Sequence, residues 1–570
     1  MIRINKGYRA ALVKGAQAGL LAGLVINPTH AVEFNLGEVE GNFSSQLSIG
    51  ASWRAEDPDK ALISPGNVAG ATGSSSVTDD GNLNFKKGDA FSKIFKGIHD
   101  LELTYQNYGA FFRGKYWYDY ELANNGKPHG HSPNGYTAGA ELDDSGFADF
   151  AKFSGIELLD AFVYGNLELG DMPLDLRLGR QVVSWGESTF IQNGVNSINP
   201  IDVSAFRRPG AEVKEGLLPV SLLYGNLGVS DALSVEAFYQ LDWQPFVIDG
   251  CGTYFSNADI VAAGCNVGTL SVALPDKTQL AVPAASLPRF GNREPDSNGQ
   301  YGVALRYVSE ELNETEFGIY YQNLHSRIPI IAPIKTVSGG LGGYFIDYPE
   351  DVSQYGVSFN TNVGTWSVSG EYSYRPDQPL QVNTIDILRA GFGVPTTYSS
   401  TFNAAAPGRV NGHDTVGVSQ AQVTVVKFLD QVAGASRVTL IGEAGANYVH
   451  DLPDASERAY GRSPVFGGAE KGSDGYVTST SWGYRARAVF DYPNALYGIN
   501  LKPTIAWSHD VSGFSPNANF REGRKALGLS LNADYLSKYT GGISYNSFFG
   551  GDFHDTNDRD FISINFGMSF

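Results

Sequence analysis

The residues best placed to do chemistry in this sequence are charged side chains between Gly186 and Gly216. Arg207 and Arg208 are adjacent, Glu212 and further charges follow closely, and prolines and glycines set bends around them. Charges of both signs on a proline-stiffened loop create a transverse field if the loop folds into a pore, and such a field selects solutes. Charge runs are also common on solvated surfaces. The segment is therefore either a pore constriction or a solvated outer loop.

The other reactive residues give little support for an enzyme. The chain has 9 histidines, but none accompanies a recognisable nucleophile motif of the kind that a hydrolase needs. His129 and His131 bring two imidazoles together, yet their surroundings offer no obvious third and fourth metal ligand. We therefore expect no enzyme, no cofactor and no metal site. Some acidic residues could hold Ca²⁺, although surface acidity is the simpler explanation: residues 141–144, Asp552, Asp555 and Asp558.

The chain contains 2 cysteines, and both fall in one connection between predicted strands. An unpaired thiol exposed outside the cytoplasm would be oxidised. We therefore predict a disulfide between Cys251 and Cys265. In the loop-entropy model a bridge of this separation stabilises the fold by about 3 kcal/mol.

Composition restricts the class of protein. The formal net charge of −19 excludes nucleic acid as a natural partner, because phosphate binding needs a basic surface. The sequence has 68 Gly, 30 Tyr and 33 Phe, and its mean hydropathy is −0.18. A chain that is rich in aromatic residues but polar on average suits one large sheet with an apolar face and a wet face.

Residues 1–31 have the pattern of a secretory signal peptide. Basic residues precede an apolar run from Ala16 to Ile26, Pro28 ends the run, and Ala31 offers a cleavage site. The run is shorter than the roughly 20 residues of a spanning helix. We expect the mature chain to begin near Val32. Because no long apolar run follows, that chain can enter a membrane only as strands.

Alternation along the mature chain supplies such strands. From Ala110 to Leu122 apolar and aromatic residues at even positions are expected to face lipid, and charged residues at odd positions the lumen. Segments 482–491 and 527–535 repeat the pattern. Continued alternation would aim Arg180 at lipid, so we predict a bulge at Gly179 that turns it inward. The expected luminal residues are Arg113, Lys115, Asp119, Glu121, Arg177, Arg180, Glu443, Arg485 and Arg487.

Eighteen such segments follow one another, and the gaps between them alternate strictly between long and short. Outer-membrane barrels have short periplasmic turns, long outer loops and an even strand number. The sequence therefore predicts an all-β, transmembrane antiparallel barrel over residues 32–570. The predicted strands are 42–55, 97–106, 109–122, 157–169, 173–185, 217–228, 233–244, 299–309, 315–324, 353–362, 365–375, 414–428, 436–449, 477–491, 497–508, 523–536, 538–549 and 560–570.

The C-terminal segment alternates in the same way. Ile562, Ile564, Phe566, Met568 and Phe570 alternate with small and polar residues, and the chain stops on an aromatic. This looks like the terminal signal that the outer-membrane assembly machinery recognises, with Phe566 and Phe570 as its aromatic positions. It predicts a Gram-negative outer membrane, with its lipid and lipopolysaccharide, as the surroundings of the barrel.

Several segments resemble a domain-of-unknown-function family of proteobacterial outer-membrane proteins: "FNLGEVEG", "SQLSIGASWR", "DDGNLNF", "GDAFSKIFKG", "GRQVVSWGES", "NPIDVSAFRRPGAEVKEG" and "GRKALGLSLNADYL". The resemblance covers the chain from Phe34 to Phe570. Members are often encoded beside a LolB-like periplasmic lipid carrier and an RND-type inner-membrane transporter. The resemblance implies traffic of apolar molecules across the envelope and identifies no binding residue.

Two function classes remain. The first is a channel or conduit for hydrophobic or amphipathic compounds, working with such a carrier and transporter. The second is a structural or docking protein without transport activity of its own. We expect segment 186–216 to fold inward and gate the barrel, with its charges pairing with Arg113, Glu121, Arg485 or Arg487. The rival plug is segment 56–96, whose "AFSKIFKG" could form a short amphipathic helix inside.

Overall fold

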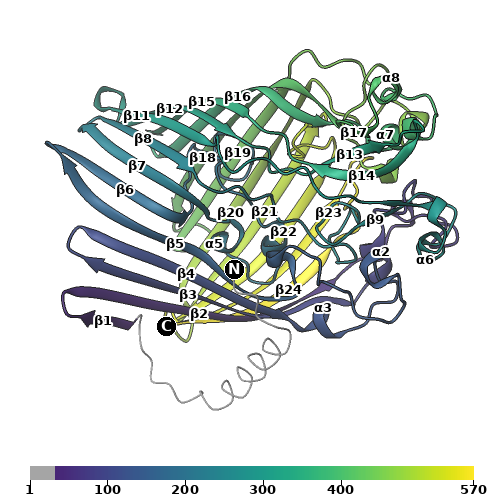
Figure 1. Ribbon diagram of the computed structural model, residues 1–570. Helices are drawn as coiled ribbons and strands as arrows, with labels where there is room; N and C mark the ends of the chain where they lie inside the picture. The colour runs from purple at the N-terminus through teal and green to yellow at the C-terminus, as the bar shows by residue number, and fades with distance from the viewer. Residues whose placement is uncertain (1–31) are drawn as a thin grey trace.

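The computed structural model describes residues 32–570, so the predicted signal peptide lies outside the described residues. The fold is a closed barrel of eighteen antiparallel strands, as predicted (Figure 1). Its strands are β2 (Val39–Arg54), β3 (Ala90–Tyr105), β4 (Tyr108–Asp119), β5 (Ser154–Leu169), β6 (Met172–Gln181), β7 (Val220–Ser230), β8 (Leu233–Gln240), β11 (Tyr301–Ser309), β12 (Thr315–Leu324), β15 (Val352–Val363), β16 (Trp366–Gln381), β18 (His413–Asp430), β19 (Arg437–Val449), β20 (Thr480–Leu496), β21 (Ile499–Ser512), β22 (Lys525–Tyr535), β23 (Tyr539–Phe549) and β24 (Phe561–Ser569).

The first and last barrel strands pair directly. β2 runs antiparallel to β24 from Gln46 opposite Ser569 to Arg54 opposite Phe561. Phe570 extends this seam, because its amide donates to the Ser45 carbonyl at 2.9 Å and its carbonyl accepts from the Ser45 amide at 2.7 Å. Closure leaves the long strands without a free edge.

The connections sort by length, as the sequence predicts. Short turns join the strands at one end of the barrel, and long loops gather at the other (Figure 1). We number the long loops in chain order as L1 (55–89), L2 (120–153), L3 (182–219), L4 (241–300), L5 (325–351), L6 (382–412), L7 (450–479), L8 (513–524) and L9 (550–560). They contain α2 (Asp80–Asn84), α3 (Tyr120–Asn124), α4 (Val203–Phe206), α5 (Val213–Gly216), β9 (Val267–Thr269), α6 (Asp276–Leu280), β10 (Ser286–Pro288), β13 (Ile330–Lys335), β14 (Leu341–Asp347), α7 (Thr384–Gly391), α8 (Ser399–Ala404) and β17 (Gly408–Arg409).

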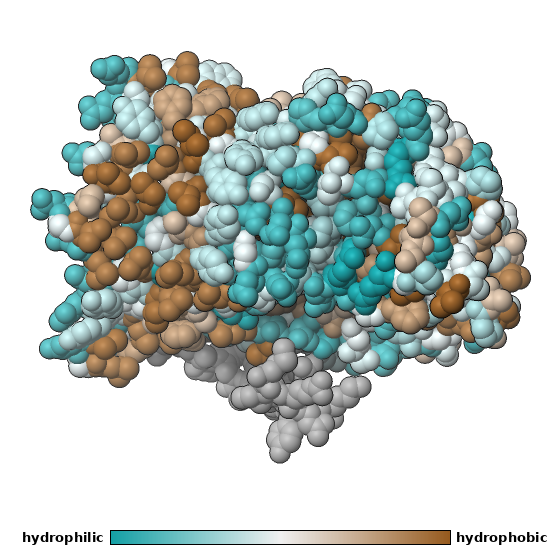
Figure 2. Space-filling model, turned by 45° about the horizontal axis from the view of Figure 1, so that its top comes forward, coloured by the Kyte–Doolittle hydropathy of each residue, from teal (hydrophilic) through white to brown (hydrophobic). Residues whose placement is uncertain are grey.

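The outward faces of the strands form an apolar belt. Figure 2 shows hydrophobic side chains covering the strand half of the molecule, whereas polar ones dominate the loop half. Belt residues with large exposed side chains include Ile156, Leu158, Val163, Leu178, Leu223, Val303, Ile319 and Val357. A closed barrel with an apolar outer band and short turns at one end is a transmembrane barrel of the outer-membrane type. No described helix is long and apolar enough to cross a membrane.

Two local predictions are wrong, and one strand was not predicted. β4 ends at Asp119 rather than Leu122, because the Asp119 side chain accepts the amides of Glu121 and Leu122 and so starts α3. The "AFSKIFKG" segment is strand rather than helix, since it pairs with β2 as the first half of β3. Residues before β2 form an additional short strand, β1 (Val32–Leu36), which pairs with β2 as a hairpin.

The bulge predicted at Gly179 is also absent. The register of β6 runs without interruption through Gly179 and Arg180 against both β5 and β7. The irregularity lies across the sheet, where Leu159 and Asp160 of β5 oppose Arg113 of β4. This places a carboxylate beside Arg113, with its Nη1 3.3 Å from Asp160 Oδ2. The extra residue therefore lies in β5, and not at Gly179 of β6.

Candidate functional site

Loop L3 lies inside the barrel, and α5 is enclosed by the ring of strands in Figure 1. The first part of L3 is bound by Glu443 of β19. The Glu443 carboxylate accepts three successive backbone amides, from Thr189 at 2.8 Å, Phe190 at 2.7 Å and Ile191 at 2.6 Å. Hydrogen bonds from amides to an ionised carboxylate are about twice as strong as neutral ones. A buried side chain of the wall therefore fixes the backbone of the loop.

Glu371 of β16 makes a second clamp of the same kind. Its carboxylate accepts the Glu187 amide at 2.6 Å and the Val195 amide at 2.9 Å. On the same strand Arg375 donates to the carbonyls of Asn193 at 2.8 Å and Gly194 at 3.0 Å. The turn between these anchors thus has its amides and carbonyls satisfied by the barrel wall instead of by secondary structure of its own.

An apolar cluster holds the base of L3 against the neighbouring strands. Trp185 is fully buried, its Nε1 donates to Glu236 of β8 at 2.7 Å, and the cluster includes Val195 and Ile198 of the loop. Val183 of the loop also belongs to the cluster, and the other members are mostly inward residues of the wall: Val220, Leu222, Tyr224, Phe238, Ala304, Tyr320 and Leu324. The apolar residues Val183 and Trp185 of the "VVSWGES" segment thus pack against the inner wall from β7 to β12.

The second part of L3 crosses to the opposite wall. Glu215 lies 2.5 Å from Lys96 Nζ of β3 and 3.8 Å from Lys115 Nζ of β4, and all three side chains are almost fully buried. Glu212 accepts a hydrogen bond from Gln46 of β2, and Lys214 Nζ donates to the same glutamine at 2.9 Å. The loop is anchored at two nearly opposite places in the barrel.

The adjacent arginines point toward other loops. Arg207 pairs with Asp249 of L4 at 2.5 Å, and its guanidinium lies 4.4 Å from the Phe255 ring centre. Arg208 donates to the Phe150 carbonyl of L2 at 2.7 Å and lies over the Trp117 ring. Both arginines therefore bind L3 to its neighbours, and neither is left as a free charge in the pore.

The partners predicted for L3 are wrong. Arg113 pairs with Asp100 and Asp160 on the wall itself, because the bulge in β5 brings Asp160 to it. Glu121 belongs to α3 in L2 and pairs with Lys93 and Lys127, so it does not line the barrel wall. Arg485 pairs with Asp510. Among the other predicted luminal residues, Asp119 caps α3, Arg177 lies over the Tyr224 ring, and Arg180 is half-buried beside Asp160.

The strands that L3 leaves uncovered, β20 to β23, border the remaining open space. A cavity of about 370 Å³ lies there between Phe190 of L3 and the inner wall. Arg487 reaches it without an ion pair or hydrogen bond in the described part of the chain. Phe548 adds a second ring, and Arg485 and the Asn546 amide also line the cavity. Most other residues of the inner lining are small or carry hydroxyl groups: Thr504, Ala506, Ser508, Ala526, Gly528, Ser530 and Ser544.

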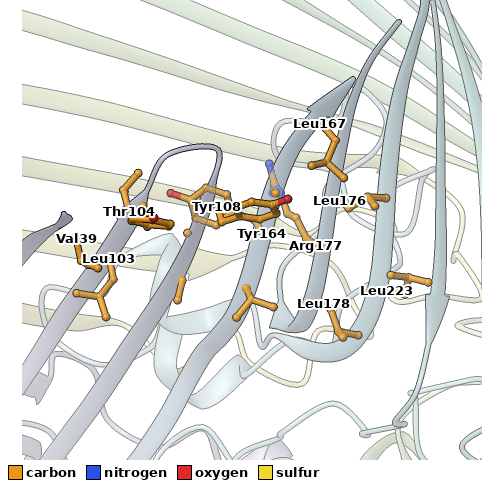
Figure 3. Close-up of a pocket in the computed structure, with 15 residues that line it drawn as sticks. Val39, Leu103, Thr104, Tyr108, Tyr164, Leu167, Leu176, Arg177, Leu178 and Leu223 are labelled. Carbon is orange, nitrogen blue, oxygen red and sulfur yellow. The ribbon is translucent and has the colours of Figure 1, made fainter. Parts of the chain in front are cut away.

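A larger hollow of about 560 Å³ lies on the lipid side of the barrel. Its lining includes the small residues Ala110 and Gly165. Larger apolar side chains of β3 to β7 also line it, among them Leu103, Tyr108 and Leu178 (Figure 3). Because these residues belong to the apolar belt, the hollow is a groove open to acyl chains and no part of the lumen.

The remaining predicted sites lie at the two ends of the barrel. Cys251 and Cys265 form a disulfide in L4, with Cα atoms 6.1 Å apart. His131 of L2 packs on this bridge, since its Nδ1 lies 2.9 Å from the Cys251 carbonyl and its Nε2 accepts the Asp143 amide at 2.8 Å. Phe566 is exposed on the belt, and Phe570 completes the seam between β24 and β2.

Sequence reasoning missed several anchors of L3. Glu371 and Arg375 lie in a predicted strand whose neighbours alternate, so their inward direction was readable from the sequence. Lys96 lies in segment 56–96, which was expected to be a loop, so its position on β3 was not. Phe190 has no such signal, because it belongs to an irregular turn. A carboxylate that binds backbone amides of a distant loop leaves no spacing pattern.

Comparisons with known proteins found similar solved structures and one family model. Solved structures that are similar over nearly the full chain include Acinetobacter baumannii OccAB1 (TM-score 0.43, 10% identity, 93% of this chain and 96% of that chain), the Pseudomonas aeruginosa outer membrane protein OpdK (TM-score 0.39, 9% identity, 93% and 98%) and Acinetobacter baumannii OccAB3 (TM-score 0.40, 10% identity, 93% and 99%). No curated protein matches the sequence. A family model described as a protein of unknown function, DUF1302, matches residues 12–570. The chain therefore belongs to the DUF1302 family.

Proposed function

We propose that the chain is an outer-membrane channel whose passage runs between L3 and the inner wall of β20 to β23. The observation that carries this proposal is the double anchoring of L3. Glu371 and Glu443 bind one part of it, and Lys96 and Gln46 bind the other. A loop that served only to close the lumen would not need one defined position. A loop that is held in one place beside a wall of small residues leaves a passage of fixed shape.

The lining of that passage favours amphipathic solutes that carry a negative charge. Phe190 and Phe548 offer apolar faces, and the hydroxyl-bearing residues of the wall offer hydrogen bonds. Arg487 borders the cavity and forms no ion pair within residues 32–570, and charged side chains in a constriction select permeant ions by sign. A hydrophobic body with a carboxylate group would use all three features.

The periplasmic partners belong to the same proposal. The family resemblance stated above includes neighbouring genes for a LolB-like carrier and an RND-type transporter. A channel for amphipathic solutes would need such proteins, because these solutes partition into membranes when they are released in water. We therefore propose that solute passes between the barrel and a periplasmic carrier protein.

Planar-bilayer recording on the purified protein tests the channel. Glu443→Gln replaces one acceptor oxygen by an amide group that cannot accept the L3 amides, so L3 should loosen. We expect unitary conductance to rise about twofold or more, with more frequent sub-states. Glu102→Gln is the matched control, because Glu102 lies on β3 and accepts a hydrogen bond from Tyr164 at 2.8 Å, and no hydrogen bond or ion pair joins it to L3 within residues 32–570. It removes the same charge and should leave the conductance close to that of the unmodified protein.

Two results would contradict the proposal. Equal conductance in Glu443→Gln and the unmodified protein would show that L3 does not set the passage. Silence of both proteins, with barrels that are folded by their gel migration, would remove the channel and favour the docking role.

A further inference from the structure

Four aspartates from two separate loops meet in the cap above the barrel. Asp79 and Asp80 lie at the start of α2 in L1, and Asp259 and Asp276 belong to L4. None of the four side chains is more than 1% exposed. His129 of L2 joins them, and in Figure 1 the labels α2 and α6 mark this part of the loop end.

The ligand atoms of these residues converge. One atom each from Asp80, His129 and Asp276 lie within 4.8 Å of one another, and so do one each from Asp79, Asp80 and Asp259. Asp80 belongs to both groups. His129 Nε2 is 3.3 Å from Asp276 Oδ2 and 3.5 Å from Asp80 Oδ1, without the geometry of a hydrogen bond. The centre of the cluster is therefore Asp80.

The other three aspartates have ordinary hydrogen-bond donors. Asp79 accepts the Ser64 amide at 2.8 Å, Asp259 accepts Ser256 Oγ at 2.5 Å, and Asp276 accepts Asn67 Nδ2 at 2.5 Å.

Asp80 differs, because neither of its carboxylate oxygens accepts a hydrogen bond from any described residue. A fully buried carboxylate without a donor is costly, and such groups are normally paired or coordinate a metal.

The charge of the cluster also indicates a bound cation. No lysine or arginine forms an ion pair with any of the four aspartates in the described chain, and His129 is their one basic partner there. One imidazolium cannot balance four buried carboxylates. A divalent cation at Asp80 would supply the missing positive charge and occupy both unsatisfied oxygens.

We propose that L1, L2 and L4 jointly bind one Ca²⁺ ion at Asp80. Ca²⁺ takes six to eight oxygen ligands and accepts bidentate carboxylates in irregular geometry, which suits four aspartates that converge from separate segments. Zn²⁺ prefers four ligands rich in nitrogen and sulfur, and this cluster offers one imidazole.

The surrounding structure keeps the ligands in place. The disulfide between Cys251 and Cys265 encloses the segment that carries Asp259, and Asn67 of L1 contacts both Asp79 and Asp276. The ion would thus fasten three loops into one rigid cap. Its binding is independent of whether the barrel conducts, so it does not rest on the proposed function.

The test uses the full mature protein in detergent, stripped with EDTA and dialysed against CaCl2. Metal analysis should find about one Ca²⁺ per chain in the unmodified protein and less than about 0.2 in Asp80→Asn. The unmodified protein should unfold about 3 °C or more higher in Ca²⁺ than in EDTA. Asp80→Asn should lose that difference, and it should be at least as stable as the unmodified protein in EDTA because like-charge repulsion falls.

Two further variants keep the test decisive. Asp552→Asn removes an exposed acidic residue of L9 and should bind Ca²⁺ as the unmodified protein does. If Asp80→Asn does not fold, judged by gel migration, Asp276→Asn replaces it. The proposal is overturned if the unmodified protein binds no Ca²⁺, if it retains stoichiometric Zn²⁺ in place of Ca²⁺, or if Asp80→Asn binds as much Ca²⁺ as the control.

Discussion

At the scale of single residues, partners decide what a luminal charge does. Arg485 and Arg487 lie two positions apart on β20 and both point inward. Arg485 Nη2 is held 2.7 Å from Asp510 Oδ1, whereas Arg487 borders the open cavity. A paired arginine contributes little net field, so Arg487 is the residue that should influence permeant ions.

Arg487→Glu should therefore lower the anion preference of the channel. The reversal potential under a salt gradient should move toward the cation value, and the anion-to-cation permeability ratio should fall about twofold or more. Lys471→Glu makes the same charge change on an exposed loop tip of L7 and should leave the ratio unchanged. A ratio that moves equally in both variants would attribute the effect to net charge.

The sequence predicts the direction of residues better than their contacts. Glu443 is correctly placed on an inward position by alternation alone, since its neighbours on β19 follow a period of two. Its role as acceptor for three L3 amides depends on a loop far away in the chain. For two acidic residues of L9 the expected exposure was wrong. Asp555 and Asp558 were expected on the surface, but they are buried and pair with Arg521 and Arg54.

At the scale of elements, the long loops pack on one another as well as on the strands. L4 is the longest connection, and its bridge between Cys251 and Cys265 lies in an apolar cluster with Phe147 and Phe153 of L2. The two cysteines and their common loop were predictable from the sequence, whereas the packing of this loop on His131 and its position beside Asp259 were not. Spacing identifies a bridge within one connection, whereas packing between connections depends on the closed barrel.

The disulfide leads to a prediction about loop order. Native protein that has not been reduced should fail to react with a thiol reagent, and denatured protein should react only after reduction. A Cys251→Ser and Cys265→Ser double variant should retain the barrel but release L4, because the bridge contributes about 3 kcal/mol in the loop-entropy model. Limited proteolysis should then cut L4 faster than L7. Ready labelling of both cysteines in the native protein would contradict the bridge.

At the scale of the whole molecule, two patterns are sufficient to predict the barrel. Long and short gaps alternate between the segments, and apolar and polar residues alternate within them. All eighteen expected strands occur, although their ends differ by several residues at β3, β4 and β16. These ends depend on where neighbours stop pairing and where a cap such as Asp119 begins a helix. The interior of the barrel was predictable only in outline, since L3 is placed by contacts with walls far apart in the sequence.

Closure of the ring gives the last prediction, which concerns the seam. β24 pairs with both β23 and β2, and the two hydrogen bonds between Phe570 and Ser45 end the β2 side of that seam. A closed barrel has no edge from which SDS can unfold it at room temperature, so unboiled protein should migrate faster than boiled protein.

Deleting Phe570 removes both hydrogen bonds and the terminal aromatic, and it should lower the fraction of faster-migrating protein in isolated membranes several-fold. Phe570→Tyr, which keeps the backbone and the ring, should restore most of it. Normal assembly of the deletion variant would show that the remainder of the seam is sufficient, and identical migration of boiled and unboiled samples would contradict the closed barrel itself.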